Sequence, residues 1–193
     1  SILGDQVPVL FPIESLIAAA QQQKGESKQA VLTLQSAIYQ YTTVFLSFLT
    51  NYLQLVIDDP DKFSETVSRG KSFEKLFNFQ EMHPVALMNF QLSATFGYAQ
   101  MEDEMLQEFV EVLQGTTFPV VLHGDDYFDQ IDEWLEYLEI GNQLPRDSMK
   151  VKEGLLEMVI NNPTFAQFED QEQVQEIFTK LRSIREQDVT ENE

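Results

Sequence analysis

The sequence predicts an all-α protein, a single-domain bundle of about six to eight helices around a long central helix at about residues 28–57. Apolar residues recur at intervals of three and four along every long segment. Many of these segments begin at an Asp or Pro signal, and several end at Gly. Only residues 116–122, TTFPVVL, have the composition of a strand, and no second strand pattern lies nearby to pair with them.

The predicted central helix includes residues 29–57, which carry no charge. Its polar residues recur every three or four places and share one stripe of a helix, which consists of Ser36, Gln40, Thr43, Ser47, Thr50 and Gln54. The other faces are apolar, so we expect the helix to be buried nearly all round, with Phe45 and Leu49 in the core. A membrane span is the alternative, but the densest apolar run, residues 44–57, is shorter than the ~20 residues required.

Two further helices are predicted around the central one. Residues 13–23 are predicted to form a short helix that residues 24–26, Lys-Gly-Glu, break, and Ser27 is the expected N-cap of the central helix. Asp59 followed by Pro60 opens the next helix, because Asp caps a helix and Pro suits its first position. We expect Gly70 to break or kink that helix.

The second half of the chain continues in helices. A helical pattern runs from Pro84 to Gln114, and we expect Gly97 to divide it and Gly115 to cap its end. Residues 116–122 contain Pro119, so they are predicted to be an extended connection. Three more helices are predicted. The first begins at Asp125 or Asp126 and ends at Ile140, and the second begins at Asp147 and ends before Pro163. The third begins after Asp170.

Length and composition indicate one domain. The chain has 193 residues, of which 43% are hydrophobic, enough for a core without disulfides. We expect this domain to cover residues 1–187 and a flexible acidic tail to cover residues 188–193. The absence of cysteine excludes disulfides, thiolate metal sites and cysteine nucleophiles. The first residues lack the pattern of a signal peptide, and we therefore expect a cytoplasmic protein.

The net charge of −20 is concentrated in one part of the chain. Residues 101–145 contain twelve acidic residues and no Lys or Arg. A field of one sign repels nucleic acid and anionic lipid, and attracts basic proteins or cations. We therefore expect no direct nucleic-acid ligand. The short apolar run predicts no membrane span, and we expect no cofactor.

The favoured functional prediction is a non-catalytic binding protein that presents this acidic stretch to a basic protein or peptide. The partner would be a basic nuclease or toxin that it inhibits, a basic segment of a client that it chaperones, or a nucleic-acid-binding protein whose ligand it mimics. Acids interleaved with aromatic residues suit ion pairs and cation–π contacts with Arg and Lys. The predicted contact residues are Glu104, Glu108, Glu111, Asp125, Asp126, Tyr127, Asp129, Asp132, Glu133, Glu136 and Tyr137. A solvated acidic face that serves only solubility is the competing interpretation.

The alternative function is a divalent-metal-dependent hydrolase. Carboxylates on two acidic helices are the ligands that Mg²⁺ and Mn²⁺ prefer, and His123 would be a base. The predicted ligands are Glu104, Glu108, Asp129, Asp132 and Glu136. The two histidines, His83 and His123, both lie in predicted connections, where a structural function is more common than catalysis. The sequence contains no Gly-x-Ser-x-Gly motif and no P-loop.

Overall fold

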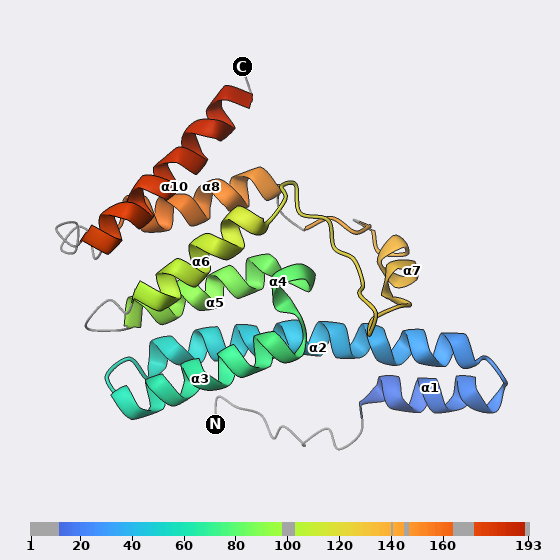
Figure 1. Cartoon of the computed structure of the whole chain (residues 1–193). Helices are drawn as coiled ribbons and strands as arrows, with labels where there is room; N and C mark the ends of the chain where they lie inside the picture. The colour runs from blue at the N-terminus through green and yellow to red at the C-terminus, as the bar shows by residue number, and fades with distance from the viewer. Residues whose placement is uncertain (1–11, 98–102, 140, 145–146, 164–171, 192–193) are drawn as a thin grey trace, which may run out of the picture.

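Helix α2 (Ser27–Leu55) organises the molecule (Figure 1). In this computed structural model, which describes residues 12–97, 103–139, 141–144, 147–163 and 172–191, α2 contacts both of its neighbours along the chain. Helix α1 (Ile13–Gln23) lies along the N-terminal half of α2, and the two helices are joined by a turn at Gly25, where φ is 80°. Helix α3 (Pro60–Leu76) folds back along its C-terminal half (Figure 1).

The other helices cover α2 from the opposite side (Figure 1). The short α4 (Phe79–Met82) leads into α5 (Pro84–Gly97), which packs on α2, and α6 (Asp103–Gly115) packs on α5. Helix α10 (Glu172–Glu191) contacts both α6 and α8 (Ser148–Ile160). The two-turn helix α7 (Ile131–Glu136) lies against the N-terminal half of α2 (Figure 1).

The core has two parts. The larger cluster joins α2, α3, α5, α6, α8 and α10, with Leu46, Leu53 and Phe90 among its fully buried side chains. A smaller cluster holds α7 against α2, and its buried members are Tyr39, Met82, Phe128, Ile131 and Leu135. Within the described residues, the only β-pairing is an isolated antiparallel bridge between Val121 and Gln143. The all-α prediction is confirmed, and no described helix is long and apolar enough to cross a membrane.

Several predicted helix boundaries are confirmed. At the N-termini of α3 and α8, short-range hydrogen bonds from capping residues set the boundary. Asp59 caps α3 and accepts a hydrogen bond from the Lys62 amide at 3.2 Å, with Pro60 as the first helical residue. Asp147 caps α8 and accepts from the amides of Met149 and Lys150. α6 ends at Gly115, as predicted, whereas the predicted division at Gly97 adjoins residues 98–102, which lie outside the described residues. Residues 116–122 form a connection without regular strand structure.

Other boundaries differ from the prediction. The N-cap of α2 is Glu26, one residue before the predicted Ser27. Gly70 does not break α3, which continues through it as one helix. The Asp170 cap lies outside the described residues, and α10 continues as a helix beyond Gln187 to Glu191.

The helix predicted from Asp125 to Ile140 is wrong, because among the described residues 125–139 only the six residues of α7 are helical. The Asp125 carboxylate accepts from the amides of Tyr127 and Phe128, at 3.0 and 2.9 Å, and closes a turn in place of a helix. The acidic residues from Asp125 to Glu136 therefore do not share one helical face.

The expectation that α2 is buried nearly all round is also wrong. Leu46 and Leu53 are fully buried, but Phe45 is 46% exposed and Phe48 is 66% exposed. Leu49 is partly buried against the core. The physical reason is that the helices packed on α2 cover only part of its circumference, and apolar composition alone does not reveal which part.

Candidate functional site

A groove with a volume of about 790 Å³ opens between α2 and α5. The connection after α6 contributes Val120 and Leu122 to its wall, and α8 contributes Met158. The volume lies within the range of about 300–1,000 Å³ that is usual for ligand sites. This groove is the candidate functional site of the protein.

The polar stripe of α2 forms one wall of the groove. Three of its hydroxyl groups donate to carbonyls on their own helix: Thr43 to Tyr39 at 3.0 Å, Ser47 to Thr43 at 3.0 Å and Thr50 to Leu46 at 2.9 Å. Because each hydroxyl oxygen keeps a free lone pair, these side chains present acceptors to the groove. The sequence predicted this stripe but did not reveal what it faces.

Helix α5 forms the opposite wall with Val85, Asn89, Leu92 and Ser93. The Asn89 amide donates to the carbonyl of Val85 at 3.0 Å. On the α2 wall, the side-chain amides of Asn51 and Gln54 have no hydrogen-bond partner among the described residues, and both side chains are exposed. The groove therefore combines apolar surface with a few open amide groups.

No described residue that lines this groove is an Asp, Glu, Lys or Arg, although the chain contains 32 acidic and 12 basic residues. A charged ligand would lose its hydration in the groove without gaining a charged partner. This loss would cost on the order of several kcal/mol. The groove therefore suits an uncharged ligand with apolar surface.

His83 lies at the base of the groove, buried between the rings of Tyr39 and Phe79, whose centroids are 4.1 and 5.1 Å away. Burial lowers the pKa of His83 to about 4, so the imidazole is neutral at neutral pH. Its Nε2 lies 2.9 Å from the Thr43 hydroxyl oxygen. The Thr43 hydroxyl also lies 3.0 Å from the Tyr39 carbonyl, so this hydrogen-bond network and the two flanking rings hold the imidazole in place. This geometry supports a structural function for His83.

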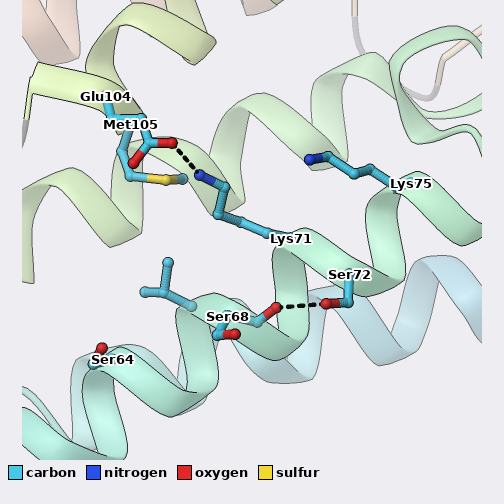
Figure 2. A pocket seen from close by; sticks show the side chains of 8 residues that line it. Ser64, Ser68, Lys71, Ser72, Lys75, Glu104 and Met105 are labelled. Atoms are coloured by element: carbon cyan, nitrogen blue, oxygen red, sulfur yellow. Dashed lines mark hydrogen bonds and ion pairs between the residues drawn. The ribbon is translucent and has the colours of Figure 1, made fainter.

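The acidic residues predicted as a partner surface fall into two groups. The first group lies on α6, where the Lys71 ammonium is 2.9 Å from a carboxylate oxygen of both Glu104 and Glu108. Figure 2 shows Lys71 reaching from α3 to Glu104 beside a small pocket lined by Ser64, Ser68 and Ser72. Two carboxylates already neutralise this lysine, and Lys75 also lines the pocket. Glu111 accepts from the side-chain amide of Gln107 at 3.2 Å.

The second group surrounds α7 and is largely engaged within the fold. Asp132 accepts from the Gly124 amide at 2.6 Å, and Glu133 pairs with Lys28 at 2.6 Å. Asp129 accepts from the side chain of Gln35 at 2.8 Å, which lowers the pKa of its carboxyl. Gln35 also donates to the Tyr127 carbonyl and accepts from the Gln130 amide, a clamp that the sequence analysis missed.

Four predicted contact residues remain available on this side of the molecule. The carboxylates of Asp126 and Glu136 are exposed and have no hydrogen bond or ion pair with the described part of the chain. Tyr127 and Tyr137 are also exposed, although the Tyr127 ring touches Phe128, with centroids 4.9 Å apart. We call these four residues the acidic–aromatic surface.

The metal-dependent alternative receives no support from the arrangement of the carboxylates. Glu104 and Glu108 bind Lys71, whereas Asp129, Asp132 and Glu136 belong to the segment around α7. Nowhere in the described ranges are three His, Asp or Glu side chains placed to hold a metal ion. His123, the predicted base, is exposed, and its Nδ1 lies 2.8 Å from the Gly124 carbonyl oxygen.

Comparison with known protein families, with curated proteins and with solved structures gave no match. The class of the protein is therefore defined by its geometry. It is a helical protein with an uncharged groove and a strongly negative overall charge.

Proposed function

We propose that this is a non-catalytic binding protein that holds an uncharged, largely apolar segment of a basic partner polypeptide in the groove between α2 and α5. The observation that carries the proposal is the neutrality of the groove in a chain whose net charge is −20. Neutral amide and hydroxyl groups can serve the backbone of a peptide, and the apolar wall can serve its side chains.

The length of the groove favours a polypeptide over a small molecule. Its α2 wall extends from Tyr39 to Gln54, which corresponds to roughly 22 Å at 1.5 Å per residue. An extended peptide of about seven residues has this length, since a strand rises about 3.3 Å per residue. The open amides of Asn51 and Gln54 supply both donors and acceptors for its backbone.

The charge outside the groove favours a partner that is basic on either side of the bound segment. A protein of net charge −20 attracts positive chains at long range and repels nucleic acid. Of the three partner types considered above, a client segment that the protein chaperones suits an open groove best. A cytoplasmic location is part of this proposal, because a chain without cysteine fits a reducing compartment.

Selection from a random peptide-display library with the purified protein tests the proposal. We expect enriched peptides to contain an uncharged apolar core next to Lys or Arg. The affinity of selected peptides, measured by fluorescence anisotropy, should fall about tenfold or more in Ser47→Lys, because the lysine places an unpaired charge in the groove.

Ser72→Lys is the matched control. Ser72 and Ser47 are both exposed helical serines whose hydroxyl groups donate to the carbonyl four residues earlier at 3.0 Å. Ser72 lies on α3, outside the groove, so this variant should bind like the wild type. Equal affinities in all three proteins, or enriched peptides without an uncharged core, would refute binding in the groove.

A further inference from the structure

The exposed side of α2 carries a continuous row of apolar side chains that neither the groove nor the core uses fully. The spacing of the row alternates between three and four residues over more than three heptads, the pattern of a coiled-coil contact. We call this row the α2 seam, and it consists of Val31, Leu34, Ile38, Tyr41, Phe45, Phe48, Tyr52 and Leu55. Every member except Ile38 is exposed, from 40% for Leu34 to 82% for Leu55.

The seam lies on the opposite side of α2 from the groove. At 100° per residue, the seam and the polar stripe of Gln40, Thr43 and Ser47 are centred roughly 150° apart around the helix. A partner helix on the seam therefore leaves the groove open. The inference drawn from the seam is independent of the proposed function.

The apolar area of this side is large for a monomer. The four aromatic members together expose roughly 400 Å², if a whole aromatic side chain presents about 200 Å². α1 packs beside the seam and adds the exposed side chains of Ile13, Leu16 and Ile17, and the Tyr41 hydroxyl donates to Glu14 of α1 at 3.3 Å. The combined exposed apolar area of the seam and of these α1 side chains exceeds the largest apolar patch of most monomers, about 300–600 Å². It approaches the ~800 Å² that each partner buries in a stable interface.

The charge of this side identifies the kind of partner. Residues 12–57 contain two acids, Glu14 and Glu26, and two bases, Lys24 and Lys28, so their net charge is zero in a chain of −20. A basic partner gains nothing here, because the excess negative charge lies elsewhere. Two copies of a strongly negative protein repel each other least where each presents a neutral face.

Six of the eight seam residues are also complementary to one another, whereas Val31 and Leu34 lie beyond the paired segment. If two copies of α2 pack antiparallel about a two-fold axis between positions 45 and 48, Phe45 of each copy faces Phe48 of the other. Tyr41 then faces Tyr52, and Ile38 faces Leu55, so each pair contains side chains of similar size and polarity. An interface formed by the same patch on both subunits is what a two-fold dimer requires.

We propose that the α2 seam is the interface of a homodimer in which α2 of one copy packs antiparallel against α2 of a second copy. The contact is apolar and each copy carries −20, so added salt screens the repulsion and strengthens the dimer. This dependence is opposite to that expected for binding a basic partner, which salt weakens.

Sedimentation equilibrium of the wild-type chain tests the dimer. We expect a mass twice the chain mass of 22.3 kDa, with a dissociation constant that falls as NaCl is added. Phe48→Asp should sediment as a monomer. Leu76→Asp is the matched control, because Leu76 is an equally exposed apolar residue, 74% against 66%, at the end of α3 and outside the seam, so this variant should remain dimeric.

A circular dichroism spectrum equal to that of the wild type shows that Phe48→Asp remains folded. If that variant unfolds, Leu55→Asp replaces it, because Leu55 is the most exposed member of the seam. A wild-type protein that is monomeric at every concentration and salt would overturn the proposal, and the seam would then belong to a different partner. A dimer that survives both substitutions would overturn it as well.

Spin labels test the antiparallel arrangement. The chain has no cysteine, so Leu34→Cys and Leu55→Cys each introduce one labelling site per copy. In the antiparallel pair, the axial separation between the two labels is roughly 38 Å at position 34 and roughly 26 Å at position 55, from 1.5 Å per residue. Short and equal distances at both positions would indicate a parallel pair and would overturn the antiparallel assignment.

Discussion

The backbone of Gly70 in α3 lies directly against the ring of Phe90 in α5. A methyl group at Gly70 would fall 2.0 Å from Cζ of that ring, and Phe90 is fully buried, so the ring has no free space to enter. The glycine that the sequence suggested as a break in α3 is instead a position where α3 meets the Phe90 ring of α5 without room for a side chain. The close approach holds α3 against α5, the helix that forms one wall of the groove.

We expect Gly70→Ala to destabilise the protein. Overpacking of a filled core costs about 1–3 kcal/mol, which exceeds the gain of up to ~1 kcal/mol from the higher helix propensity of alanine. Urea unfolding measures the difference. Gly154→Ala is the control, because a methyl group at this position in α8 meets no atom within 4 Å, and it should stabilise the protein slightly. A Gly70→Ala protein as stable as the wild type would contradict the observed packing.

The stability of the protein should depend on the protonation of Glu74. This side chain is buried and its Oε2 has no hydrogen-bond partner. Burial, followed by the charge of Glu108, raises the pKa of Glu74 to about 7 from its ordinary 4.5, although Lys71 and Lys75 act in the other direction. Between pH 4.5 and 7 the folded state keeps a proton that the unfolded state releases, so stability falls as the pH rises through this window.

Glu74→Gln should remove that dependence. At pH 8 we expect it to raise the free energy of unfolding by up to about 3 kcal/mol, from 1.36 kcal/mol per pKa unit, and at pH 4.5 to change it little. Urea unfolding at several pH values gives the comparison. Glu153→Gln, at an exposed position in α8, is the control and should change stability by less than about 0.5 kcal/mol. A gain at pH 8 no larger than that of the control would show that the fold does not raise the pKa of Glu74.

Burial predicts that alanine substitution of one leucine in α2 and of another in α3 has very different effects on stability. Leu46 is fully buried in the larger core cluster, so Leu46→Ala should cost about 2–5 kcal/mol. Leu76 at the end of α3 is exposed, and Leu76→Ala should cost less than about 0.5 kcal/mol. Similar losses in the two variants, measured by thermal or urea unfolding, would contradict the burial of Leu46 in the core.

The acidic residues should separate into those that stabilise the fold and those that attract a partner. Asp132→Asn weakens the hydrogen bond from the Gly124 amide and should cost about 1–3 kcal/mol of stability. The double change Asp126→Asn and Glu136→Gln, in the acidic–aromatic surface, should leave stability unchanged. Stopped-flow measurements with a selected basic peptide should show slower association for the double variant at low salt and a smaller difference at high salt. An unchanged association rate at low salt would argue that this surface does not steer the partner.

The sequence alone was sufficient for several features that depend on residues close together in the chain. The caps at Asp59 and Asp147 are such features, because a carboxylate that accepts from an amide two or three residues later needs no distant partner. The helical class followed from apolar periodicity in the same way. The stripe of Thr43, Ser47 and Thr50 was also visible, since a helix places these residues on one face.

Features set by contacts between distant segments required the tertiary structure. Asp125 was predicted to begin a helix, but Gln35, about ninety residues away, and the Gly124–Asp132 hydrogen bond hold the segment in a turn. The exposed seam, the approach of Gly70 to Phe90 and the neutral groove likewise depend on which helices meet. Periodicity determines which face of a helix is apolar, but the partners that cover or leave open that face are chosen by packing among all helices at once, and this is why only the tertiary structure decided them.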